Sequence, residues 1–148
     1  MVRVAIASDH AGYKLKKYIL NVLDNHVELI DLGTYSEDPV DYPDIAKRLV
    51  KALRSGEAEY GILICGTGIG MSIAANKYRG IRAALIYSEE SAELARKHND
   101  ANVVCLGGRT MKHNEAIKWV LKWLRAGFEG GRHERRINKI REAESPCP

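Results

Sequence analysis

The sequence predicts an α/β fold: a single-domain, doubly wound (Rossmann-like) three-layer sandwich with a five-stranded parallel sheet and a basic C-terminal helix. Short apolar runs alternate with helical patterns along the chain, as they do when helices cover both faces of a parallel sheet. Right-handed crossovers then give the doubly wound topology. The chain has 148 residues, a length that fits one domain with a complete core. No linker or internal repeat interrupts it.

Five apolar runs have the length of strands. A strand that is covered on both faces is a nearly continuous apolar run of about four to eight residues. The predicted strands are, in chain order, Val2–Ala7, Val27–Leu32, Tyr60–Cys65, Arg82–Tyr87 and Asn102–Leu106.

Between and after these strands, apolar residues recur at intervals of three and four, which is typical of amphipathic helices. Leu15, Ile19 and Val22 show this spacing in the first helix. Pro43 suits the first turn of the second helix, and Ser88 is a good N-cap for the fourth. The predicted helices span residues 12–25, 42–53, 71–76, 88–97, 114–125 and 132–142.

Composition and charge exclude several classes of protein. Hydrophobic residues make up 45% of the chain and charged residues 28%, which excludes a disordered or fibrous protein. No apolar run approaches the roughly 20 residues of a membrane span, and the N-terminal segment turns polar too early for a signal peptide. The three cysteines are widely spaced and form no CxxC pattern. We therefore expect a reducing, cytoplasmic location, with neither disulfides nor a cysteine zinc site.

In a doubly wound fold, function lies at the carboxyl ends of the strands. Asp9 and His10 follow the first predicted strand. A carboxylate beside an imidazole suits proton transfer, or the holding of a hydroxyl group and a phosphate. The alternative is that Asp9 only caps the helix that follows.

The third predicted strand ends in a glycine-rich segment. Alternating glycines let backbone N–H groups converge on an anion, either a phosphate or the oxyanion of an intermediate. The segment matches neither the dinucleotide fingerprint nor the Walker pattern. Its candidate binding residues are Gly66, Thr67, Gly68, Ile69 and Gly70.

Cys65 stands at the mouth of this glycine segment. Thiols near a helix N-terminus ionise readily, so Cys65 is a candidate base or nucleophile. The alternative is a small buried apolar residue at a strand end. Cys105 lies inside a predicted strand and is interpreted as a core residue.

Further polar candidates follow later elements. His98 and Asn99 end the fourth long helix and could lie on the rim of the crevice, and Arg109 follows the fifth strand. Arg132 and Arg136 are spaced i, i+4, so they share one helix face and suit a phosphate. A solvated face or an RNA contact is the alternative for this basic segment. The five histidines show no ligand spacing that indicates a metal site.

Four segments together resemble the ribose-5-phosphate isomerase type B family, which also includes isomerases of allose 6-phosphate and galactose 6-phosphate. They occur in the family's order, and the match extends over nearly the whole chain. The segments are SDHAG (8–12), CGTGIGMSIAANK (65–77), RKHNDANVVCLGGR (96–109) and GGRHERRI (130–137).

The resemblance implies interconversion of D-ribose 5-phosphate and D-ribulose 5-phosphate without a metal or organic cofactor. It also implies a homodimer, often paired into a tetramer, in which both subunits line each active site. Cys65 matches the family's catalytic base, and His98 matches the residue that opens the sugar ring. Asp9 and Thr67 are candidates to move a proton between the two sugar oxygens. The substrate-binding positions that match are Asp9, His10, residues 66–70, Asn99, Arg109, Arg132 and Arg136.

Three alternatives stay open. A hexose-6-phosphate isomerase would use the same residues with a roomier pocket. A non-catalytic phosphosugar-binding module would keep the glycine segment and the arginines without the chemistry. An RNA-binding protein would use the basic C-terminal helix, although no nucleic-acid motif occurs there. Residues 144–148 are expected to form a disordered tail, in which Cys147 is incidental.

Overall fold

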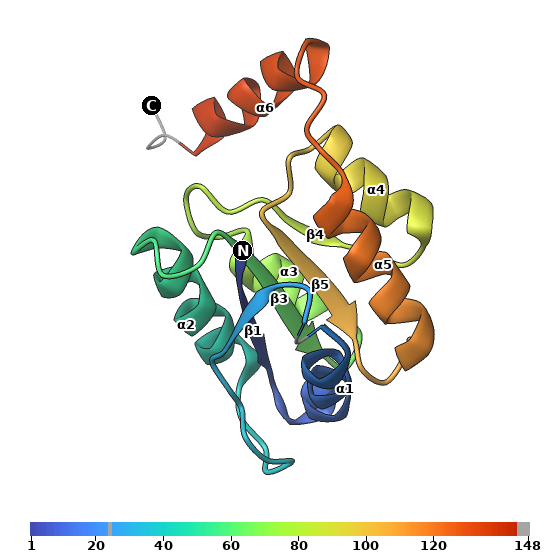
Figure 1. The fold of residues 1–148 in the computed structure, drawn as a ribbon. Coiled ribbons are helices and arrows are strands. Elements are labelled where there is room, and N and C mark those ends of the chain that lie inside the picture. The colour runs from blue at the N-terminus through green and yellow to red at the C-terminus, as the bar shows by residue number, and fades with distance from the viewer. Residues whose placement is uncertain (24, 145–148) are drawn as a thin grey trace.

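The computed structural model describes residues 1–23 and 25–144 of the chain. All strand pairs in its sheet are parallel, and the order is β2-β1-β3-β5-β4. The predicted five-stranded parallel sheet is therefore confirmed (Figure 1). The strands are β1 (Arg3–Ser8), β2 (Glu28–Asp31), β3 (Tyr60–Cys65), β4 (Ala83–Leu85) and β5 (Val103–Gly107).

Helices cover both faces of the sheet and make the three layers that the alternating pattern predicts. One face carries Val4, Ile6 and their neighbours and packs against α1, α4 and α5, whereas Ala5 and Ala7 face α2 and α3. The alternation follows from the two-residue period of a strand. The helical elements are η1 (His10–Gly12, a 3-10 turn), α1 (Tyr13–Leu23), α2 (Tyr42–Arg54), α3 (Ile69–Ala75), α4 (Glu89–Lys97), α5 (His113–Arg125) and α6 (Arg132–Ala143).

Most element boundaries differ from the prediction by one or two residues, and two of these differences have a clear physical reason. Helix α3 begins at Ile69 rather than at Met71, because Gly68 adopts a left-handed conformation (φ +82°) and turns the chain abruptly from strand into helix. Strand β4 ends at Leu85 rather than Tyr87. It is an edge strand that pairs only with β5, so no second neighbour extends it.

The last helix, α6, lies beside the amino ends of the strands, on the side opposite their carboxyl ends (Figure 1). The Glu129 N–H donates to the Lys97 carbonyl (3.1 Å), just before α6 begins. At the other end of α6, the Glu144 carboxylate accepts from the Gly80 N–H (3.1 Å). His133 and Ile137 form the buried face of this helix. The rest of the tail predicted to be disordered, residues 145–148 with Cys147, lies outside the described residues.

Within residues 1–23 and 25–144, no helix combines the length and the apolar character that crossing a bilayer requires.

Candidate active site

The glycine segment after β3 forms a concave turn that ends at α3. The Gly68 N–H donates to Cys65 Sγ (3.2 Å), and Cys65 is only 5% exposed. The geometry thus places a potential base among backbone N–H groups. Thr67 and Ile69 are exposed on the same turn, where Thr67 Oγ1 accepts from the Ile69 N–H (3.2 Å).

Gly68 is required here both by its backbone angle and by its neighbours. A Cβ at this position would lie 2.6 Å from Leu85 Cδ1 and 2.9 Å from the carbonyl carbon of Leu106. The turn therefore packs directly on the ends of β4 and β5, with no room for a side chain.

Replacing Gly68 with alanine is expected to destabilise the fold by roughly 2–4 kcal/mol, because left-handed strain and overpacking add together. Gly56→Ala is the matched control, since Gly56 also has positive φ (+79°) but nothing lies within 4 Å of its added Cβ. Urea denaturation of both variants gives the free energies of unfolding. Equal losses for the two variants would contradict the role of close packing at Gly68.

Asp9 and His10 lie at the end of β1, next to this turn. Asp9 is the N-cap of η1, and its Oδ1 accepts from the N–H groups of Ala11 (2.9 Å) and Gly12 (3.1 Å). The capping role that the sequence allowed is therefore present. The Val40 N–H donates to His10 Nδ1 (3.2 Å). This hydrogen bond assigns the ring proton to Nε2, which can then donate to a ligand.

Arg109 reaches the same place from the end of β5. Its backbone N–H donates to the Gly66 carbonyl (3.0 Å), and the Gly108 N–H donates to the Cys65 carbonyl (2.8 Å). The Arg109 side chain runs over Gly66, because a Cβ on that glycine would lie 3.8 Å from Arg109 Cδ. The structure thus gathers one set of predicted site residues at the carboxyl edge of the sheet: Asp9, His10, Cys65, residues 66–70 and Arg109.

The other predicted residues lie at the opposite edge of the sheet, meaning the edge formed by the amino ends of the strands. His98 and Asn99 follow α4, which runs antiparallel to the strands and ends just before the start of β5. The length of β5, about 13 Å at 3.3 Å per residue, separates the two edges. Within one chain, therefore, His98 and Asn99 do not lie on the rim of the Cys65 crevice. Arg132 and Arg136 are also at this far edge, on α6.

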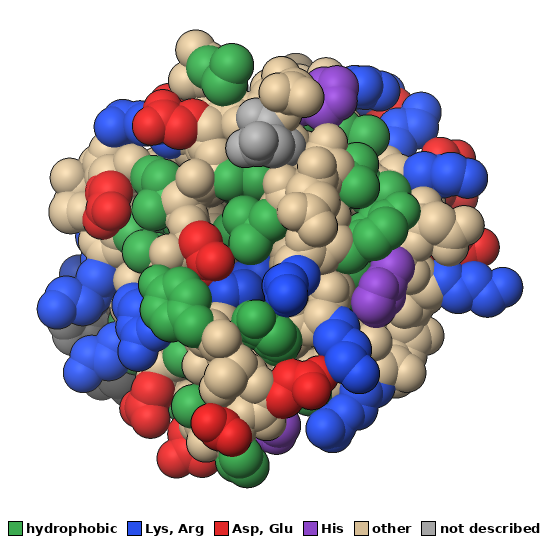
Figure 2. Space-filling view, turned by 60° about the horizontal axis from the view of Figure 1, so that its bottom comes forward, with side chains coloured by type: hydrophobic (Ala, Val, Ile, Leu, Met, Phe, Trp, Pro, Cys, Tyr) green, Lys and Arg blue, Asp and Glu red, His purple; other side chains and the backbone are tan. Residues whose placement is uncertain are grey.

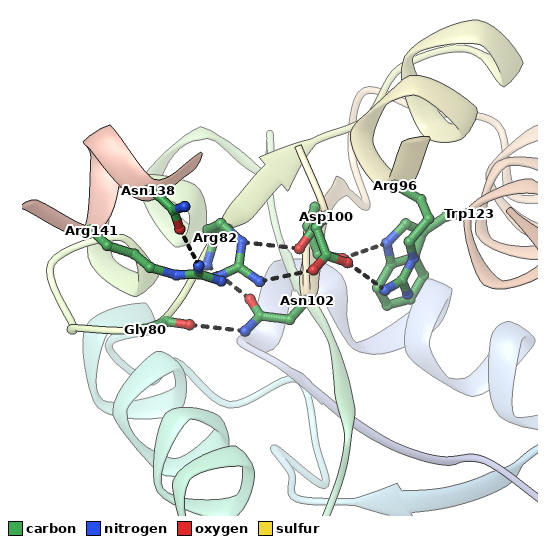
Figure 3. A network of polar contacts seen from close by, with 9 residues as sticks. Gly80, Arg82, Arg96, Asp100, Asn102, Trp123, Asn138 and Arg141 are labelled. Carbon is green, nitrogen blue, oxygen red and sulfur yellow. Dashed lines mark hydrogen bonds and ion pairs between the residues drawn. The ribbon is translucent and has the colours of Figure 1, made fainter. Parts of the chain in front are cut away.

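The turn that carries His98 and Asn99 is held by a partly buried polar network (Figure 3). Asp100 has an unusual positive φ (45°), and its carboxylate pairs with Arg82 and Arg96, both at 3.5 Å. The Arg96 guanidinium is almost fully buried and lies 4.0 Å from the centroid of the Tyr60 ring. Desolvation lowers the pKa of Arg82, and the charge of Asp100 acts against this shift. These contacts fix the backbone on which His98 is mounted.

The sequence analysis did not identify two residues beside His98. The His98 ring stacks on His133, with centroids 4.1 Å apart and planes 11° apart. Glu129 Oε1 lies 3.4 Å from His98 Nε2. His98 follows α4 and His133 lies in α6, far away in the sequence, so no local spacing could have linked them.

The interpretation of Cys105 as a core residue is supported, because Cys105 is fully buried and desolvation strongly raises the pKa of its thiol.

Several apolar side chains are exposed around the Cys65 turn. Ile69 and Ile73 are spaced i, i+4 on α3 and are 52% and 58% exposed, and Tyr42 is 39% exposed. When the molecule is turned so that the carboxyl ends of the strands come forward, its surface shows hydrophobic patches between charged side chains (Figure 2).

Comparisons with known proteins relate the chain to one family of isomerases. Residues 4–140 match the family model described as Ribose/Galactose Isomerase. The chain is 45% identical over 145 residues to ribose-5-phosphate isomerase B of Escherichia coli, with 97% of each chain covered. It is similar to the structure of Clostridium thermocellum ribose-5-phosphate isomerase B, with a TM-score of 0.95, 47% identity and 97% of each chain covered.

A second similar structure is ribose-5-phosphate isomerase B of Mycoplasma genitalium with bound ribulose-5-phosphate. Its TM-score is 0.91 at 46% identity, and the match covers 99% of this chain and 98% of that one. The family model spans most of the chain, and the relatives match it almost end to end. The chain therefore belongs to the ribose/galactose isomerase family.

Proposed function

We propose that the protein interconverts D-ribose 5-phosphate and D-ribulose 5-phosphate through an enediolate, with Cys65 as the base. The observation that carries this proposal is the position of Cys65 Sγ, which accepts a hydrogen bond from the Gly68 N–H inside a turn of backbone donors. The substrate is inferred from the similar proteins, because two of those with known structure are ribose-5-phosphate isomerases B.

The reaction moves one proton between neighbouring carbons. The Cys65 thiolate removes the proton from the carbon next to the carbonyl group and returns it to the former carbonyl carbon. The backbone N–H groups of residues 66–70 stabilise the negative charge that develops on the enediolate oxygen. Asp9 and Thr67 move the second proton between the two sugar oxygens. This scheme uses only side chains and backbone amides, without a metal or organic cofactor.

The distal phosphate needs hydrogen-bond donors, among them cationic side chains, and its binding energy orients the sugar for reaction. His10 and Arg109 lie at the Cys65 edge, whereas Arg132 and Arg136 lie at the far edge of the same chain. We propose that two copies form a homodimer in which the far edge of one copy completes the Cys65 edge of the other. His98 then opens the sugar ring in the partner's site, and Asn99 binds the same sugar.

Two features of the single chain support this arrangement. His133 and Ile137 occupy the buried face of α6, so the i, i+4 pair Arg132 and Arg136 stays exposed and available to a second copy. The exposed Ile69 and Ile73 beside the Cys65 turn are the kind of apolar surface that a subunit contact covers. Such dimers can pair further into tetramers.

Replacing Arg136 with alanine is expected to raise KM for the phosphosugar about tenfold, which corresponds to the loss of about 1.4 kcal/mol of binding. Arg135→Ala is the matched control, because Arg135 is an exposed neighbour outside the i, i+4 pair and should change KM less than about twofold. Steady-state kinetics with both variants measures the effect. Native KM in Arg136→Ala would exclude a phosphate clamp on α6.

The decisive test of the proposed function is a coupled assay that compares kcat/KM for ribose 5-phosphate, allose 6-phosphate and galactose 6-phosphate. The proposal requires the highest value for ribose 5-phosphate. A higher value for either hexose phosphate would assign the protein to that substrate. If none of the three sugar phosphates were turned over, the protein would be a non-catalytic binding module. The free thiols of Cys65 and Cys105 suit the reducing cytoplasm, where we expect the enzyme to act.

A further inference from the structure

Three potential metal ligands meet at the far edge of the sheet: His98, Glu129 and His133. Their ligating atoms all lie within 4.8 Å of one another. They come from the end of α4, from the segment before α6 and from the first turn of α6. Only the fold brings them together.

The spacing of these atoms is close to that of a tetrahedral metal site. Zinc binds histidine nitrogen and carboxylate oxygen at about 2.0–2.2 Å, so two ligands at tetrahedral corners stand about 3.4 Å apart. His98 Nε2 and Glu129 Oε1 are already 3.4 Å apart. The His133 ring stacks nearly parallel to that of His98, with centroids 4.1 Å apart, so one of the two rings has to rotate before both nitrogen lone pairs point at the same ion.

The backbone around all three ligands is fixed by hydrogen bonds. The His98 N–H donates to the Leu94 carbonyl (2.9 Å), and the Glu129 N–H donates to the Lys97 carbonyl (3.1 Å). The His133 N–H donates to the Gly130 carbonyl (3.1 Å). Metal binding therefore requires side-chain rotation and little ordering of the chain.

Glu129 supplies the one negative charge of the set, while the guanidinium groups of Arg132 and Arg136 weaken cation binding and keep the affinity moderate.

We infer that His98, Glu129 and His133 bind one Zn²⁺ ion per chain in a three-ligand site with an open fourth position. Two histidines and one carboxylate are a ligand set that zinc uses in proteins. An ion bound to His98 makes this side chain unavailable for opening the sugar ring, so Zn²⁺ inhibits the isomerase. This second consequence rests on the proposed function, whereas the binding itself does not.

The binding test uses protein without a histidine tag that carries Cys65→Ala and Cys147→Ser. These changes remove two thiols that could also hold a metal. We expect calorimetric titration with Zn²⁺ to give one site per chain in the micromolar range, and Co²⁺ to give the visible absorption of a tetrahedral complex without a sulfur charge-transfer band. Adding Glu129→Gln or His133→Asn should weaken binding by about tenfold or more, as the loss of a ligand does.

Glu134→Gln is the matched control, because Glu134 is an exposed acid next to His133 that is not among the three ligands. It should leave Zn²⁺ affinity unchanged, and circular dichroism checks that every variant is folded. The inference is overturned if Zn²⁺ does not bind, or if Glu129→Gln and His133→Asn bind it as tightly as the control. Because this protein lacks the Cys65 base, the result is independent of whether the proposed isomerisation is correct.

Inhibition is then measured on the chain with an intact Cys65. Zn²⁺ should inhibit turnover of ribose 5-phosphate, a chelator should restore it, and Glu129→Gln should need about tenfold more Zn²⁺ for the same inhibition. Equal sensitivity of Glu129→Gln and Glu134→Gln would overturn the inhibitory role and would assign the effect to another site, such as Cys65.

Discussion

Cys65→Ala is expected to lower kcat by about 10²–10⁴-fold while the fold stays intact, because the variant loses its general base. The thiol is small and sits at the end of β3, so its removal leaves the backbone N–H groups of the turn in place. Substrate binding through the arginines should therefore persist. The measurements are kcat and KM in both directions of the reaction, with the dissociation constant of substrate as a check on binding.

Cys105→Ala is the matched control for this prediction. Cys105 is fully buried in β5 and belongs to the core that packs against α2 and α3. Its truncation should lower the free energy of unfolding and leave kcat nearly unchanged. If Cys65→Ala kept near-native kcat, or if Cys105→Ala lost as much turnover, the assignment of Cys65 as base would be wrong.

A mixture of two impaired variants is expected to recover activity at substrate concentrations near the native KM, because the proposed site takes residues from two copies. One variant is Cys65→Ala, and the other is Arg132→Ala/Arg136→Ala. In a mixed dimer, one site collects both defects and the other site collects none. Random exchange makes half of the dimers mixed, so the preparation should reach about one quarter of native activity. Co-expression followed by native mass spectrometry measures the fraction of mixed dimers.

The control for the mixture pairs Cys65→Ala with His10→Ala. Both residues lie at the same edge of the same chain, at the ends of β3 and β1. Every site of the mixed dimer then carries one of the two defects, so its activity should not exceed that of the unmixed variants. Recovery in both mixtures, or in neither mixture although mixed dimers have formed, would contradict a site shared between the edges.

The sequence alone predicted the elements that repeat a local pattern. The run of six residues that ends at Cys65 predicted β3 with both of its boundaries, because a strand covered on both faces excludes polar residues along its whole length. The glycine segment after it also predicted a concave backbone turn. Gly68 shows why, since its positive φ and the absence of a Cβ are properties of the residue itself.

Local pattern was less informative where a neighbouring element sets the limits. The apolar run 82–87 is longer than β4, because an edge strand ends where its single partner leaves it. Helix α3 begins earlier than its apolar spacing indicated, because the left-handed Gly68 allows a helix to start two residues sooner.

Only the tertiary structure decided where α6, which carries Arg132 and Arg136, packs relative to the two ends of the strands. For His98 the predicted topology was already informative, because a helix that joins two parallel strands runs antiparallel to them and ends at their amino ends. The direction of α4 and the docking of α6 through Glu129 and Glu144 place His98 and the arginines away from Cys65. The stacking of His98 on His133 likewise arises from contacts between distant segments. The periodicity of apolar residues predicts which face of a helix or strand is buried. Which element packs against that face depends on the packing of the whole chain.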